Sequence, residues 1–238
     1  MRNVTRKFAM AAAGVVLTAT SASAQILNFG GSAVFRDQPG SGGANLFVDF
    51  LQAVAPSTEP TQANTTGGII SAVPTTTFAG ISSGTTGQIQ DLIIGSGGVL
   101  SASTGAGVST GGLPIMNFVQ IGGYTFTLAS SSTGGTFGGI TLTQNGNNTS
   151  ATFSVVGNVM GGALAANTTY NGVFTAQFVD QTPEQVFNTI ASGGQAAASF
   201  SATFAARQST VPEPSTYMLL ATGIGALGMV ARRRRTNV

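Results

Sequence analysis

The chain of 238 residues contains no cysteine, no histidine and no tryptophan. Without cysteine it forms no disulfide framework and offers no thiol nucleophile. Without histidine it lacks the most common general base and a preferred zinc ligand. These absences exclude the usual nucleophilic and zinc-dependent mechanisms, and they predict a protein without a metal or another cofactor.

Charged residues are also scarce, at 7% of the chain against about 25% in an ordinary domain. Seven of the nine basic residues lie at the two ends, as Arg2, Arg6, Lys7 and the cluster Arg232–Arg235. Between these ends two arginines stand against six carboxylates, which gives a formal charge of −4. A nucleic-acid-binding protein needs a basic patch on its folded body, so this distribution excludes that class.

The first 24 residues have the three parts of a secretory signal peptide. The segment MRNVTRK supplies positive charge, FAMAAAGVVL supplies a short apolar core, and Ala22 and Ala24 are small residues that signal peptidase accepts. We predict cleavage before Gln25 after recognition by the export machinery, which also removes Lys7, the only lysine. A permanent N-terminal anchor is the alternative, but the apolar run is shorter than the roughly 20 residues of a membrane span.

A second apolar segment lies near the C-terminus. Residues 215–231 carry no charge, and four arginines follow at once: Arg232, Arg233, Arg234 and Arg235. As a transmembrane helix these residues would extend about 25 Å, and the arginines would hold its end in the cytoplasm. The segment contains G-I-G-A-L-G, but a dinucleotide site also needs a preceding strand and an acidic residue farther along the chain.

Three residues, Pro212, Glu213 and Pro214, stand directly before this apolar segment. Each proline restricts its own backbone and that of the preceding residue, so the stretch is expected to be extended and exposed. Pro-Glu-Pro, an apolar span and an arginine cluster, in this order, resemble the PEP-CTERM sorting signal. That module also appears in family naming as an ice-binding protein C-terminal domain, but the resemblance covers only residues 211–238.

The resemblance implies that an exosortase, a membrane protease of bacteria that make exopolysaccharide, recognises Pro212, Glu213 and Pro214. The span would then be a transient anchor in the inner membrane, before the protein reaches the cell surface or the extracellular biofilm matrix. The chain would comprise a signal peptide at residues 1–24, an exported body at 25–210 and a sorting signal at 211–238.

The body is rich in short runs in which apolar and polar residues alternate, a period typical of half-buried β-strands. The predicted strands are residues 27–36, 44–54, 87–94, 115–121, 124–128, 151–155, 173–179 and 199–204. The predicted turns are residues 132–135, 144–147 and 171–172, and the predicted loops are the low-complexity segments 56–68 and 96–112. The strand lengths and spacing predict an all-β body, either a β-sandwich or a jelly roll.

One short helix is predicted within the body. Thr182 is a suitable N-cap, Pro183 fits the first helical position, and Gln185 completes a capping box. Gly193 and Gly194 are expected to end the helix. The apolar stripe expected to pack on the sheet consists of Val186, Phe187 and Ile190.

The polar sides of the predicted strands carry Thr, Ser, Asn and Gln in place of Lys and Glu. Such faces hydrogen-bond neutral partners, including sugars and water. They also give little protection against the pairing of sheet edges. Association with exopolysaccharide and self-association therefore both remain open.

A pair of carboxylates could still hydrolyse glycosides. The candidates are Asp37, Asp49, Glu59, Asp91, Asp180 and Glu184, but no motif connects any two of them. We therefore expect no catalytic residues. The leading hypothesis is a non-catalytic surface or matrix protein, and the alternatives are a secreted carbohydrate- or ice-binding module and a glycoside hydrolase.

Overall fold

The computed structural model describes residues 25–42, 44–51, 66–71, 78–95, 97–103, 109–132, 140–162, 164, 168–207 and 222–225. The body is all-β, as the alternation predicts, and its helix is α1 (Pro183–Ala191). The strands are β1 (Gln25–Asp37), β2 (Leu46–Phe50), β3 (Thr66–Ser71), β4 (Thr86–Gln90), β5 (Leu92–Gly95), β6 (Gly98–Ser103), β7 (Ser109–Gly112), β8 (Ile115–Ile121), β9 (Tyr124–Ser132), β10 (Thr141–Asn145), β11 (Asn148–Met160), β12 (Thr169–Phe178) and β13 (Gln195–Arg207).

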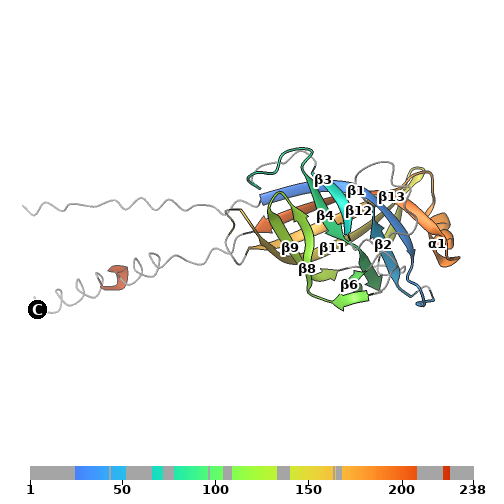
Figure 1. Ribbon diagram of the computed structural model, residues 1–238, viewed down its shortest axis with the longest axis horizontal. Coiled ribbons are helices and arrows are strands. Elements are labelled where there is room, and N and C mark those ends of the chain that lie inside the picture. The colour runs from blue at the N-terminus through green and yellow to red at the C-terminus, as the bar shows by residue number, and fades with distance from the viewer. Residues whose placement is uncertain are drawn as a thin grey trace, which may run out of the picture.

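Eight of these strands form a closed antiparallel barrel (Figure 1). Its order is β1-β13-β12-β11-β9-β8-β4-β3, and β3 returns to β1. The strand lengths and spacing predicted a β-sandwich or a jelly roll, whereas the pairing gives one continuous sheet that closes on itself. Alternation identifies the strands but not their partners, so it does not distinguish between these architectures.

A four-stranded branch leaves the barrel at β1. The first half of β1 pairs with β3 at Phe29 and Gly30, and the second half pairs with β2 from Ala33 to Asp37. From β2 the branch continues through β5, β6 and β7. Asp91 separates β4, which belongs to the barrel, from β5, which belongs to the branch. The single strand predicted at residues 87–94 is therefore two strands with different partners.

The predicted turn at residues 171–172 is wrong, because both residues lie inside β12. Gly172 faces the interior, where an added β-carbon would lie 2.6 Å from the Phe204 ring and 2.7 Å from Val155. Glycine is required there by packing and not by a chain reversal. The turn predicted at residues 144–147 is confirmed, since Gly146, with φ of +62°, joins β10 to β11.

The low-complexity segments are only partly loops. Residues 98–103 and 109–112 form β6 and β7, and residues 66–68 open β3, so the loop prediction is wrong for these parts. Their small residues have little β-propensity of their own, but pairing with neighbouring strands overrides it. Apart from Gly97, which lies in a turn, the remainder of both segments and most of the turn predicted at 132–135 lie outside the described residues.

Phenylalanine rings fill the inside of the barrel. Phe174 lies among them, stacked on Phe153 with 4.8 Å between ring centroids and edge-on to Phe29 and Phe204 at 6.0 and 5.6 Å. On β13, Phe200 and Phe204 alternate with inward-facing alanines. Small residues on this strand leave room for rings from the strands around it, so large and small side chains interdigitate.

Helix α1 lies at one end of the barrel and packs against β1, β13 and β10 (Figure 1). Its predicted start is confirmed, because Gln185 N–H donates to Thr182 Oγ1 and Thr182 N–H donates to Gln185 Oε1. Gly193, with φ of +81°, follows the helix. Val186 and Ile190 are buried as predicted, whereas Phe187 is 45% exposed.

The aromatic core generates a stability prediction. Phe174→Ala should lower the free energy of unfolding by about 3–5 kcal/mol, because it removes a buried ring together with its aromatic contacts. The matched change Phe187→Ala, at an exposed ring, should cost about 1 kcal/mol or less. Urea unfolding followed by far-UV circular dichroism measures both, and equal losses would contradict the packing described.

Candidate functional site

Most residues predicted to direct sorting lie outside the described part of the chain. These residues are Ala22, Ala24, Pro212, Glu213, Pro214 and the four arginines Arg232, Arg233, Arg234 and Arg235. The predicted signal helix also lies there, and so does the predicted transmembrane helix apart from a helical turn at residues 222–225. Among the described residues, no helix is long and apolar enough to cross a membrane.

The structure does show how the two ends of the body are arranged. Gln25, the residue that follows the predicted cleavage point, begins β1 and is the register partner of Ala206 on β13. The next residue, Arg207, ends β13, and Pro212 lies five positions farther along the chain. The signal peptide and the sorting tail therefore join the barrel on adjacent strands, at the end opposite α1 (Figure 1).

The predicted carboxylate candidates lie in different surroundings. Asp37 accepts a hydrogen bond of 2.6 Å from Ser41 Oγ, and Asp180 and Glu184 are exposed beside and within α1. Glu59 lies outside the described residues. Of the described candidates only Asp49 and Asp91 come together, because Asp49 follows Val48 and Asp91 precedes Leu92, and these two residues are the last register pair between antiparallel β2 and β5. Sequence spacing gave no indication of this proximity, which depends on the pairing of distant strands.

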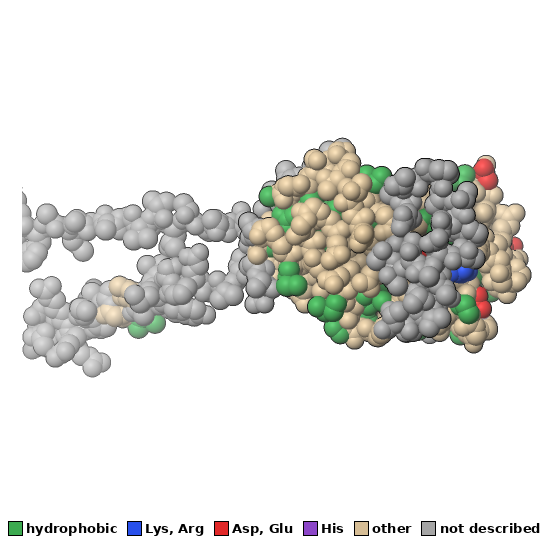
Figure 2. All heavy atoms as spheres, in the orientation of Figure 1, with side chains coloured by type: hydrophobic (Ala, Val, Ile, Leu, Met, Phe, Trp, Pro, Cys, Tyr) green, Lys and Arg blue, Asp and Glu red, His purple; other side chains and the backbone are tan. Residues whose placement is uncertain are grey.

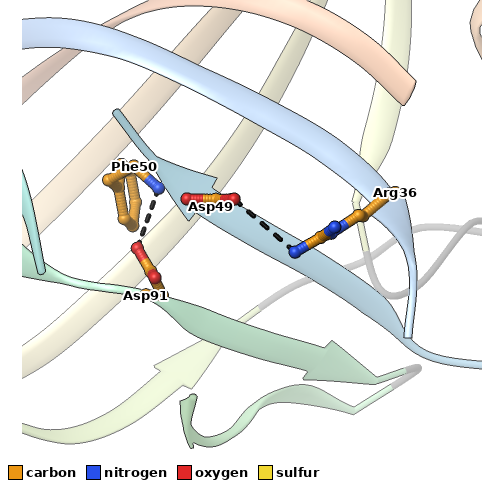
Figure 3. Close-up of polar contacts among 4 residues, drawn as sticks. All are labelled: Arg36, Asp49, Phe50 and Asp91. Carbon is orange, nitrogen blue, oxygen red and sulfur yellow. Dashed lines mark hydrogen bonds and ion pairs between the residues drawn. The ribbon is translucent and has the colours of Figure 1, made fainter. Parts of the chain in front are cut away.

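Arg36 joins these two carboxylates in a small charged cluster (Figure 3). Its Nη2 lies 3.6 Å from Asp49 Oδ2, and its guanidinium carbon lies 4.5 Å from the centre of the Phe47 ring. The arginine and Asp49 side chains are 19% and 24% exposed. Partial burial raises the pKa of Asp49 above its usual value, while the positive charge of Arg36 acts in the opposite direction.

Asp91 is fully buried at the joint between barrel and branch. Its Oδ1 accepts a hydrogen bond of 2.9 Å from the backbone N–H of Phe50, and its Oδ2 has no hydrogen-bond partner. Burial raises the pKa of Asp91 to about 8; the bond from Phe50 lowers it, nearby Asp49 raises it, and Arg36 lowers it. The carboxyl is therefore largely protonated at neutral pH.

In this cluster Asp91 holds a proton, and Arg36 and Asp49 form an ion pair. The Asp91 side chain has no contact with solvent. A glycosidic oxygen must lie within hydrogen-bond reach of a general acid, and the described structure offers it no path to this carboxyl. Within the described residues, no group of three or more Asp, Glu, His or Cys side chains is placed to hold a metal ion. The geometry instead gives Asp91 a structural role, since it links β2 to the start of β5.

The surface outside this cluster is almost uncharged. In the view of Figure 2, acidic and basic side chains gather at the end of the body that carries α1, and the rest of the described surface visible in that view carries no charged side chain. The exposed large hydrophobic residues of the described part are spread over several strands, the connections between elements, α1 and the helical turn at residues 222–225.

Comparison with known proteins supports one assignment. Residues 210–235 match the family model described as the PEP-CTERM protein-sorting motif. This range contains Pro212, Glu213 and Pro214 and ends at the fourth arginine of the cluster, Arg235, so the resemblance noted in the sequence is confirmed. A search of curated proteins and a search of solved structures each found no match to the chain.

The buried Asp91 carboxyl generates a pH prediction. Below about pH 4 the folded and unfolded states both hold its proton, whereas between about pH 4 and 8 only the folded state keeps it. Asp91 should therefore make the free energy of unfolding fall as pH rises through this window, by up to about 1.4 kcal/mol per pH unit.

The neutral variant Asp91→Asn should lose that part of the pH dependence, while its side-chain oxygen can still accept the Phe50 N–H. Urea unfolding at pH 5.0, 6.5 and 7.5 compares it with the wild type. Asp180→Asn, which removes an exposed carboxyl at a backbone φ of 54° that asparagine tolerates, is the control. Parallel profiles for the wild type and Asp91→Asn would refute the assignment.

Proposed function

We propose that this chain, which carries the PEP-CTERM protein-sorting motif at residues 210–235, is a non-catalytic protein of the cell surface or the extracellular matrix. The motif marks an exported protein that an exosortase sorts through its tail. The match to this motif is the one observation on which the proposal rests. We further propose that the protein is delivered to a biofilm that contains exopolysaccharide. The uncharged, hydroxyl-rich surface of the body supports this second proposal.

The proposed route has three steps. Signal peptidase cleaves before Gln25 during export, the apolar span at residues 215–231 then holds the protein in the inner membrane, and exosortase acts near Pro212, Glu213 and Pro214. The pairing of Gln25 with Ala206 supports this route, because both processing sites then flank the same end of the barrel. The rest of the body can fold outside the membrane while its tail is still anchored.

The chemistry of the body supports a role without catalysis. The chain has no histidine and no cysteine, and the one close carboxylate pair among the described residues includes the buried Asp91. The inside of the barrel is filled with aromatic side chains, which leaves the outer surface as the place for contacts with other molecules.

The role of Pro212, Glu213 and Pro214 in sorting can be tested by substitution. The triple variant Pro212→Ala, Glu213→Gln and Pro214→Ala should keep its tail in an exosortase-positive host, because the extended recognition stretch is lost. We expect the fraction of protein that retains residues 215–238 to rise at least tenfold and to move to the membrane fraction. Mass spectrometry of the C-terminus, in membrane, envelope and medium fractions, measures both changes.

The matched control is Glu184→Gln, which makes the same change of side chain on α1 and should leave processing unchanged. Wild-type protein that keeps its whole tail in the inner membrane of an exosortase-positive cell would overturn the proposed function. Normal processing of the triple variant would instead overturn the assignment of the recognition residues.

A further inference from the structure

The outer face of β10, β11, β12, β13 and β1 carries polar residues in regular rows. One row runs through Thr141, Thr152, Thr175 and Ser201, which are successive register partners on adjacent strands. Neighbouring strands in a sheet lie about 4.8 Å apart, so the hydroxyl groups of this row recur at about that interval. The sequence alone shows no such repeat, because these residues are far apart along the chain.

A second row lies beside the first. It runs through Thr143, Ser150, Gln177, Ser199 and Ser32, again as register partners. Each of its members on β10–β13 lies two residues from a member of the first row, a separation of about 6.8 Å along a strand. These two rows together are called the hydroxyl face.

The hydroxyl face points away from the core. On β12 and β13 the residues between its members, including Phe174, Ala176 and Phe200, are buried in the barrel. Thr152, Gln177, Ser199 and Ser201 are exposed, and Ser150 and Thr175 are partly exposed. On β11, β12, β13 and β1 the face lies inside the sheet, where pairing with a strand of another molecule does not account for it, whereas β10 pairs only with β11 and is an edge strand.

No member of either row is ionised. Hydroxyl and amide groups both donate and accept hydrogen bonds, so the face matches a partner with the same uncharged groups. An anionic polymer would find no cation on these rows, and a cationic one would find no carboxylate. A neutral polysaccharide has hydroxyl groups along its whole length, so several weak bonds to one chain can act together.

Ice is the other neutral partner with a regular array of oxygen atoms. A lattice match needs a flat surface, whereas most of each row crosses strands of the closed barrel, which curves around its axis. A flexible sugar chain can follow this curvature and an ice plane cannot. The observations therefore favour a polysaccharide.

We infer that the hydroxyl face is a multivalent, low-affinity binding surface for neutral polysaccharide. This inference goes beyond the proposed sorting function, which needs only the tail, and each can fail without the other.

The test is affinity electrophoresis of the full-length chain, kept in neutral detergent, in gels that contain dextran, soluble amylose or galactomannan. Dextran sulfate serves as the charged comparison. The row variant Thr152→Val, Thr175→Val and Ser201→Ala removes three hydroxyl groups with little change in shape. The control variant Thr86→Val, Thr125→Val and Ser83→Ala makes the same three kinds of change on β4, on β9 and in the turn before β4.

At least one neutral polymer should retard the wild type and the control variant with dissociation constants within twofold of each other. The row variant should bind that polymer at least fivefold more weakly, whereas any retardation by dextran sulfate, which the basic residues at the two ends of the full-length chain can cause, should be equal for the three proteins. Thermal unfolding checks that the variants stay folded. If the row variant is unstable, a variant of the second row that combines Thr143→Val with Ser199→Ala is tested in its place.

Equal binding by the row and control variants would overturn the inference, and so would the absence of binding to all three neutral polymers. Weaker binding of dextran sulfate by the row variant than by the control variant would also overturn it, because uncharged rows should contribute nothing to binding of that polymer. If the protein instead slowed ice recrystallisation, lost this effect in the row variant and bound none of the polymers, the hydroxyl face would be an ice-binding surface.

Discussion

The pairing of β1 with β13 is the constraint on which the rest of the structure depends. It extends over twelve register partners, from Gln25 with Ala206 to Arg36 with Gln195, and it closes the barrel. It joins the first and last strands of the body, so the barrel can close only after nearly the whole body is present. The same contact holds the ring of Phe29 on β1 against that of Phe204 on β13, at 4.9 Å between centroids, so closure and core formation occur together.

The chain compensates for its lack of charge by separating most apolar side chains from most polar ones between the two faces of one sheet. On β12 and β13 phenylalanine and alanine lie inside, and most of the residues that face outside are polar. Asp91 is the fully buried carboxylate among the described residues, and it lies where the chain passes from the barrel into the branch. A protonated carboxyl is much less costly to bury than a charged one, which is consistent with the raised pKa of this group.

Local patterns in the sequence predicted local structure well. The alternation around Phe174 and Phe204 identified β12 and β13, and the residues from Thr182 to Gln185 identified the start of α1. Features that depend on distant partners were not accessible from one sequence. Gly172 looked like a turn residue because the Phe204 ring that needs its space lies more than 30 positions away, and Asp49 and Asp91 are neighbours only because β2 pairs with β5. The closed barrel and the two hydroxyl rows were missed for the same reason, since both follow from cross-strand register.

The position of β13 has a mechanical consequence for a protein held by its tail. This strand is hydrogen-bonded to β1 on one side and to β12 on the other along most of its length. A force applied to the tail acts on the barrel at Arg207, the last residue of β13. If the opposite end of the body, beside α1, is held in place, this force is directed along the axis of β13. Both ladders then resist in shear, with many hydrogen bonds sharing the force at once. A tail attached in this way is harder to pull out of the barrel than one attached to a strand whose hydrogen bonds can break one at a time.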